Sequence, residues 1–472
     1  MLRLSGVSAA DARTAAAGVV ALETDLAQHS LARTATRDVL ANYHRVERRD
    51  LGGRFPRIPW DAYFAARGLG ALPYVIVGQP AYLDGLGELL EHHPIEVWRS
   101  YLRSHLLASA APFLSEAAEQ AHFDFYRRTL QGQPEIEPGW KRAVDVIDDR
   151  IGEALGELFV ARHFPAESRR QMEQLVGDLR AVFTDRLRSV PWMGAATRAK
   201  ALAKFARFEA HIGHPARFRD YSALVVRPDD YFGNVRRADA FEVKRRQDRL
   251  GGPVDRTEWE MSPPTVNAHF VPTMNEIFFP AGILQPPFFD AAVDPAVNYG
   301  GIGAVIGHEI THGYDDQGRR FDVDGNLNDW WSAEDAAEFE KRAKEVVQQY
   351  SAVEPIPGAR INGELTLGEN IADLGGLSVA FEALERRLAR EPQLRRTIDG
   401  LTPEQRFFIA FAQVWRQNSR PEEVRRRLTI DTHSPGLARG ALPARNMTAF
   451  WAAFSLGSNG SPHAPPATIS IW

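Results

Sequence analysis

The segment that most constrains this chain is 308–312, which reads His-Glu-Ile-Thr-His and places two histidines four residues apart. Side chains with that spacing share one face of an α-helix, so the imidazoles of His308 and His312 can reach a single metal ion. A catalytic zinc needs a third protein ligand and an open position for water. Glu309 would lie close to that ion and could accept a proton from the water. The fold must therefore bring another donor to this helix.

The segment 368–373, which reads Gly-Glu-Asn-Ile-Ala-Asp, offers the missing ligand. Glu369 and Asp373 are four residues apart on a predicted helix and face the same way, so one can bind zinc while the other orients a ligand. Ligand histidines commonly donate their second ring N–H to a carboxylate. We therefore assign Glu369 as the third zinc ligand and expect Asp373 to hold His308. Taken alone, the two carboxylates would be an ordinary solvated helix face.

Composition limits the other possibilities. The 472 residues include no cysteine, which excludes disulfides, thiolate ligands and a cysteine nucleophile. Lys and Arg total 56 against 61 Asp and Glu, a net charge of -5, so we expect no nucleic-acid partner. Apolar runs are too short for a membrane span, and residues 1–28 have the pattern of an amphipathic helix, with no signal peptide.

The order of sequence patterns predicts two domains, 1–230 and 231–472, in a mainly α fold with a small β-sheet. Two apolar stripes with helical spacing, within 144–158 and 172–183, are separated by Pro165 and are expected to pack in a core. Near residue 220 the pattern changes, because β-type residues occur in 221–226 and 265–270 among prolines and glycines. Helices are predicted from Ser332 to about residue 350 and from about 367 to 389.

Longer stretches around the two metal-binding segments carry a family resemblance. Residues 305–316 read Val-Ile-Gly-His-Glu-Ile-Thr-His-Gly-Tyr-Asp-Asp, and together with 368–373 they resemble the paired signature of the neprilysin and endothelin-converting-enzyme peptidases. Further stretches agree in the same order, namely 266–268, 279–289, 298–303, 411–415 and 433–436. The resemblance is strong from about residue 254 onward and looser before it.

The resemblance implies a thermolysin-like catalytic domain covered by the preceding helical domain, part of which would fold back onto it. It implies one zinc ion per chain and an endopeptidase that hydrolyses oligopeptides on the amino side of large hydrophobic residues. Glu309 would be the general base. His433 would donate to the oxyanion of the tetrahedral intermediate, and Asp431 would orient His433.

The family pattern also implies substrate-binding residues. Asn267 and the backbone of Ala268 would hold the substrate main chain as an added strand, and Arg439 would bind a substrate carbonyl. A set of apolar side chains would line the pocket for the residue after the scissile bond: Ile283, Phe288, Val305, Val414 and Trp415.

Family members are extracytoplasmic and usually begin with a signal peptide or anchor, whereas this chain starts inside the family pattern. The lack of cysteine fits a bacterial member. Two other classes of function remain open at this stage. A zinc-binding protein that captures peptides without cleaving them would share every ligand, and a helical interaction module would explain the first half alone. Metal analysis and a hydrolysis assay separate them.

Overall fold

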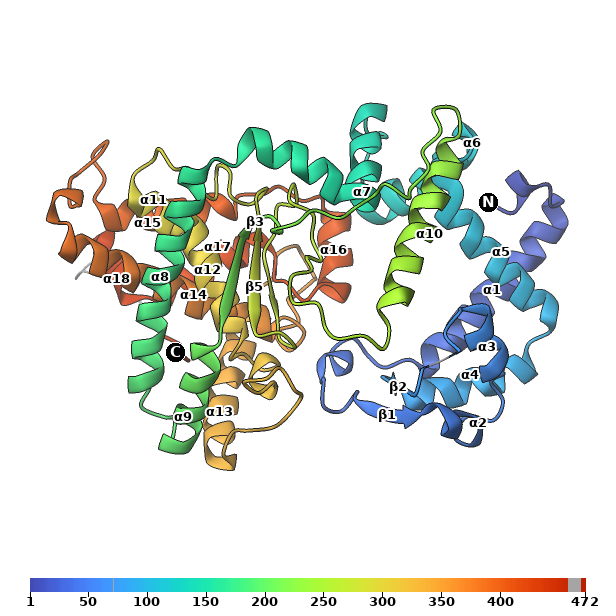
Figure 1. The fold of residues 1–472 in the computed structure, drawn as a ribbon, viewed down its shortest axis with the longest axis horizontal. Helices are drawn as coiled ribbons and strands as arrows, with labels where there is room; N and C mark the ends of the chain where they lie inside the picture. The colour runs from blue at the N-terminus through green and yellow to red at the C-terminus, as the bar shows by residue number, and fades with distance from the viewer. Residues whose placement is uncertain (71, 457–467) are drawn as a thin grey trace. The chain divides into compact units, whose positions relative to one another are not determined.

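The computed structural model describes residues 1–70, 72–456 and 468–472, most of which lie in helices (Figure 1). The mainly α fold with small sheets confirms the predicted fold class. The chain forms two compact units. The first comprises Met1–Ala143, Asp220–Val254 and Arg420–Glu423, and the second Val144–Arg219, Asp255–Ser419 and Val424–Trp472. The division into a covering domain, 1–230, and a catalytic domain, 231–472, stays a prediction.

The first unit contains helices and a two-stranded sheet in which β1 (His44–Glu47) pairs antiparallel with β2 (Tyr74–Val77). Its longer helices are α1 (Ala9–His29), α4 (Pro80–His92), α5 (Ile95–Ala110) and α10 (Tyr231–Arg249). The segment 221–226 carries β-type residues but has no strand partner among the described residues. The carbonyl of Val225 instead accepts a bond from the Arg237 side chain of α10.

The second unit contains a three-stranded sheet. Its order is β3 (Glu209–Gly213), β5 (Glu276–Pro280) and β4 (His269–Val271), with β3 parallel and β4 antiparallel to β5. The fully buried β5 lies in the middle, and β4 forms an edge. The principal helices are α8 (Ala166–Ser189), α9 (Ala195–Ala206), α12 (Ala304–His312), α13 (Ala333–Ser351), α14 (Leu367–Arg390), α15 (Pro403–Val414), α16 (Pro421–Ile430, which starts in the first unit) and α17 (Gly436–Arg445).

The two predicted apolar stripes have different outcomes. The stripe within 172–183 is buried on α8, as predicted. The stripe within 144–158 is wrong as a core face, because Leu158 is 72% exposed and Val144 and Ile147 are exposed too. These residues lie on α7 (Gly139–His163), whose backbone is broken at Ile151 with φ −131° and ψ 36°. A kink changes which residues share a face, and α7 instead buries Gly152 and Gly156.

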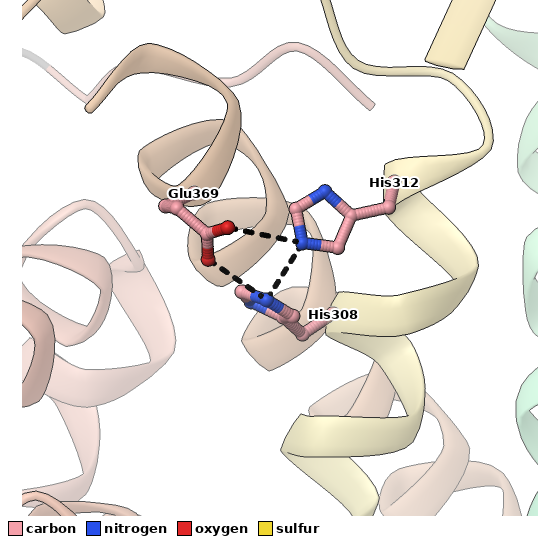
Figure 2. A group of neighbouring side chains, drawn as sticks. All are labelled: His308, His312 and Glu369. Carbon is pink, nitrogen blue, oxygen red and sulfur yellow. Dashed lines mark hydrogen bonds and ion pairs between the residues drawn. The ribbon is translucent and has the colours of Figure 1, made fainter. Parts of the chain in front are cut away.

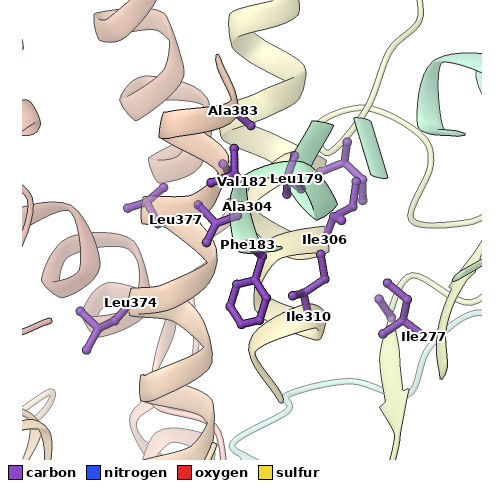
Figure 3. Packing of buried hydrophobic residues seen from close by; sticks show 14 of the residues in the cluster. Leu179, Val182, Phe183, Ile277, Ala304, Ile306, Ile310, Leu374, Leu377 and Ala383 are labelled. Atoms are coloured by element: carbon purple, nitrogen blue, oxygen red, sulfur yellow. The ribbon is translucent and has the colours of Figure 1, made fainter. Parts of the chain in front are cut away.

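The core of the second unit is centred on α8, α12 and α14. Figure 3 shows apolar side chains of these helices packed together, among them Phe183, Ile306 and Leu377. The helix predicted from Ser332 is confirmed as α13, since the Ser332 hydroxyl accepts the backbone N–H of Asp335 as an N-cap. Among the residues that the structure describes, no helix is long and apolar enough to cross a membrane.

Candidate metal centre and active site

The close approach of α12 and α14 depends on two glycines. A Cβ atom on Gly307 would lie 2.5 Å from the carbonyl oxygen of Gly376, and one on Gly376 would lie 2.4 Å from the backbone nitrogen of His308. Any larger residue would force the helices apart. This backbone contact brings the two predicted metal-binding segments side by side.

Three ligand atoms converge where these helices meet (Figure 2). The Nε2 atoms of His308 and His312 lie 2.9 Å apart. The carboxylate of Glu369 reaches both rings, with Oε2 at 3.3 Å from His308 Nε2 and Oε1 at 3.7 Å from His312 Nε2. All three ligand atoms lie within 4.8 Å of one another, which is compact enough for one metal ion.

Each histidine is held by a carboxylate at its other ring nitrogen. His308 Nδ1 donates to Asp373 Oδ1 at 2.8 Å, as the sequence led us to expect, and His312 Nδ1 donates to Asp315 Oδ2 at 2.6 Å. A ring that donates from Nδ1 offers the lone pair of Nε2 to a metal. The buried Oε2 of Glu369 has no hydrogen-bond partner among the described residues. The donor set therefore fits a divalent cation such as zinc.

The charges of the site act on its titratable groups. Burial alone would raise the pKa of the Glu369 carboxyl, but the charge of His312 and the adjacent ring of His308 hold that pKa well below its usual range. Burial would lower the pKa of His312, whereas Glu369 and Asp315 raise it, with a net result of about 10. Glu369 is therefore ionised, and a cation that binds His312 must displace a proton from it.

A buried arginine completes the support of His308. Arg439 Nε donates to Asp373 Oδ2 and Nη2 donates to Oδ1, both at 2.8 Å. Its guanidinium lies 4.0 Å over the ring of Trp415. The neighbouring carboxylates raise the pKa of Arg439 against the effect of burial. The resemblance assigns Arg439 to a substrate carbonyl, but two of its nitrogens already donate to Asp373.

Glu309 and His433 lie at the same centre. Glu309 is buried, and it follows ligand His308 directly on α12. His433 Nδ1 donates to Asp431 Oδ1 at 2.8 Å, while its Nε2 lies 3.3 Å from Glu369 Oε2. The structure therefore brings Asp431, His433 and the three predicted ligands together.

The predicted peptide-binding residues lie at a sheet edge. Asn267 is exposed and Ala268 is buried, and both directly precede the edge strand β4. Asn267 Oδ1 accepts the backbone N–H of Ala268 at 3.0 Å. The strand β4 packs against α12, which carries the histidines. An added strand at this edge would therefore lie close to the metal centre.

Four of the five predicted pocket residues lie in or against one hydrophobic cluster. Ile283 belongs to the main hydrophobic cluster of the second unit, and Phe288, Val305 and Trp415 pack against that cluster. Val414 is half-buried at the end of α15 and is absent from the cluster as far as the described residues show.

A second group of donor side chains consists of Glu209, His211 and Glu276 on strands β3 and β5. Here the buried Glu276 already pairs with Arg256 and lies 3.0 Å from His211 Nε2. The arginine supplies the positive charge that a metal would bring. We therefore assign the group to the stability of the sheet.

Sequence reasoning missed Asp315 and the pairing of Arg439 with Asp373. Asp315 was readable, because it follows His312 by three residues, within reach of that ring. The partner of Arg439 could not be read from spacing, since 66 residues separate it from Asp373.

Comparison with known proteins agrees with this geometry. Two models of peptidase family M13 match the chain, one over residues 1–215 and the other over 267–468. The chain belongs to peptidase family M13. The resemblance to neprilysin and endothelin-converting enzyme is thereby confirmed. An endothelin-converting enzyme homolog of Locusta migratoria is 35% identical over 481 residues, covering 97% of this chain and 66% of the homolog. The chain spans less than two thirds of the length of the curated relatives it matches.

Solved structures of other family members share the fold. The zinc metalloprotease Zmp1 of Mycobacterium tuberculosis, in complex with an inhibitor, is 41% identical with a TM-score of 0.93, covering 99% of this chain and 72% of that one. PepO of Lactobacillus rhamnosis is 29% identical with a TM-score of 0.90, covering 100% of this chain and 73% of that one. The chain therefore shares the fold of solved M13 peptidases.

Proposed function

We propose that this chain is a zinc-dependent endopeptidase that hydrolyses oligopeptides on the amino side of large hydrophobic residues. The observation that carries the proposal is the convergence of His308 Nε2, His312 Nε2 and the Glu369 carboxylate. Two imidazoles and one carboxylate form the ligand set of thermolysin-type catalytic zinc sites. When bound, zinc would polarise the scissile carbonyl and lower the pKa of a water molecule towards neutrality. The description of the related Zmp1 as a zinc metalloprotease supports the choice of metal.

The chain's own residues would move the protons. Glu309, next to ligand His308 on α12, would accept a proton from the attacking water and pass it to the leaving amine. His433 would donate from Nε2 to the oxyanion, while its Nδ1 remains bonded to Asp431 at 2.8 Å. Ser434 holds this segment in place, because its hydroxyl donates to Asn370 Oδ1 of α14 at 2.7 Å.

The substrate would bind as an extra strand along β4. Asn267 and the backbone of Ala268 would hydrogen-bond its main chain, which gives affinity with little dependence on sequence. Arg439 donates to Asp373 from Nε and Nη2, so it would reach a substrate carbonyl with Nη1. The side chain after the scissile bond would enter an apolar pocket with these walls: Ile283, Phe288, Val305, Val414 and Trp415.

The proposal includes the division of labour between the two parts of the chain. Every residue with a proposed role in metal binding, catalysis or substrate binding belongs to the second unit. The catalytic domain proposed from the sequence, 231–472, contains all of them. The helical part before it would act as the cover that limits access for long substrates.

Substitutions of Glu309 and His312 test the proposal. Glu309→Gln keeps the size of the side chain but removes the base, so it should retain one zinc per chain and lose turnover by about a hundred- to ten-thousandfold. His312→Ala should lose stoichiometric zinc. Zinc is counted by atomic absorption, and cleavage is followed on a pool of short peptides. The exposed Glu345 of α13 gives a matched control, Glu345→Gln.

Three results would contradict the proposal. Near-normal turnover in the Glu309→Gln variant would place the base elsewhere, and tightly bound zinc in the His312→Ala variant would refute the ligand set. A parent that binds zinc and peptides without cleaving them would be a peptide-capture protein.

A further inference from the structure

We propose that Lys204 is a positioning residue for the metal ligand His312, acting through the loop that follows α12. The inference rests on the proposed function and assigns a role outside the ligands and their carboxylates. Lys204 lies on α9 and is 0% exposed.

The ammonium group of Lys204 binds the loop at three points. Its Nζ donates to the carbonyl oxygens of Gly313, Gly318 and Phe321, each at 2.8 Å. Gly313 directly follows ligand His312, and Phe321 lies at the far end of the loop. The loop is therefore anchored on both sides of Asp315.

Asp315 connects the anchored loop to the metal ligand His312. Its Oδ1 accepts the backbone N–H groups of Gln317 at 2.9 Å and Gly318 at 2.7 Å. Its Oδ2 accepts from His312 Nδ1 at 2.6 Å. The carbonyl of Gly318 binds Lys204 while its N–H binds Asp315, so the lysine sets the position of the carboxylate that orients His312.

Two further contacts restrict the loop, one with α9 and one with the end of α12. The hydroxyl of Tyr314 donates to the carbonyl of Ala201 at 2.9 Å. Gly318 lies so close to the end of α12 that a Cβ atom there would be 1.7 Å from the carbonyl oxygen of His312. The loop thus has little space in which to shift without moving the ligand.

Burial and nearby carboxylates have opposite effects on the charge of Lys204. Burial lowers the pKa of Lys204 to about 7, while the charges of Asp315 and Asp322 act in the opposite direction. Three carbonyl acceptors require three N–H donors, which the protonated amine has. A neutral side chain would leave at least one buried carbonyl unpaired.

The test compares Lys204→Gln with Lys200→Gln, a lysine one turn earlier on α9 that donates to the carbonyl of Trp330 at 3.2 Å. Zinc affinity is measured by competition with a chromogenic chelator, and the cobalt-substituted protein reports ligand geometry by its visible spectrum. We expect Lys204→Gln to lower zinc affinity about 10- to 100-fold and to alter the cobalt spectrum. Lys200→Gln should match the parent in both.

The outcome separates positioning from general stability. If Lys204 served stability alone, the folded Lys204→Gln variant would melt earlier but keep the parental zinc affinity and cobalt spectrum, and that result overturns the inference. In an Asp315→Ala background, Lys204→Gln should have little further effect on zinc affinity. Fully additive losses in the two substitutions would also overturn it.

Two arrangements keep the test decisive. If Lys204→Gln does not fold, Lys204→Arg keeps the charge but cannot direct three N–H groups from one atom, and parental zinc affinity in that variant refutes the inference. The parent protein tests the proposed function independently. A parent that binds one zinc and cleaves peptides, beside an unaffected Lys204→Gln variant, leaves the function standing and removes only the role of Lys204.

Discussion

Replacing Gly376 with alanine tests whether the contact between α12 and α14 sets the geometry of the metal centre. The new Cβ atom would lie 2.4 Å from the backbone nitrogen of His308 and 2.7 Å from the carbonyl oxygen of Ala304, where ordinary contacts begin at 3.4 Å. Both neighbours are helix backbone, so no flexible side chain can move aside. The two helices must separate locally.

The expected size of the effect follows from these distances. Relieving the contact requires a shift of about 1 Å, whereas metal–ligand distances tolerate only about 0.2 Å. Glu369 and Asp373 move with α14, while His308 and His312 stay on α12. We expect zinc affinity to fall by at least about tenfold. Overpacking costs about 1–3 kcal/mol of stability, and alanine recovers up to about 1 kcal/mol in a helix, so the protein should still fold.

The assay is a chelator competition for zinc on folded protein, together with denaturant unfolding. Gly177→Ala on α8 is the matched control, because a Cβ atom there meets nothing within 4 Å. That variant should gain about 0.4–1 kcal/mol of stability and keep the parental zinc affinity. If Gly376→Ala binds zinc as tightly as the parent, the helix contact does not set the ligand geometry.

Two further predictions concern pH and specificity. Because the pKa of His312 is raised to about 10, protons compete with zinc for its Nε2 atom. Apparent zinc affinity should therefore rise with pH, by about tenfold per pH unit for each displaced proton. Chelator competition between about pH 6 and 8 measures this dependence, and a flat profile would contradict it. Val305→Phe should narrow the proposed pocket and shift cleavage towards smaller residues after the scissile bond, by about 1–3 kcal/mol in relative kcat/KM. Cleavage sites are mapped by mass spectrometry of the peptide products. An unchanged preference for the residue after the scissile bond would contradict the pocket assignment.

The metal ligands could be predicted because their geometry is mainly local. Spacing alone places His308 and His312 on one helix face, and places Glu369 and Asp373 on another. What spacing could not supply is the approach of the two helices, which depends on the absence of a side chain at Gly376. Glycine has a low helix propensity, so a glycine within a predicted helix shows its role in packing only once the neighbouring helix is known.

The errors have a common physical origin. The apolar stripe of α7 has helical spacing, but the break at Ile151 turns its members to different faces. The residues at 221–226 have strand propensity, yet the carbonyl of Val225 bonds to a side chain of α10 instead of to a strand. Lys204 was missed because its partners lie more than a hundred residues away, in a loop whose carbonyl groups carry no sequence signature. In each case tertiary contacts decide what local pattern leaves open.

The charges around the centre suggest why both histidines are supported in the same way. Each ring donates to a buried aspartate, and each aspartate has a buried cation nearby, Arg439 in direct contact with Asp373 and Lys204 across the loop from Asp315. Within each pair the two opposite charges compensate each other, because burying an unpaired charge costs free energy. The carboxylates of Glu369 and Glu309 remain to balance the two positive charges of a divalent ion. A divalent ion that displaces the imidazole protons therefore leaves the charge of the centre balanced, in the state that the proposed hydrolysis requires.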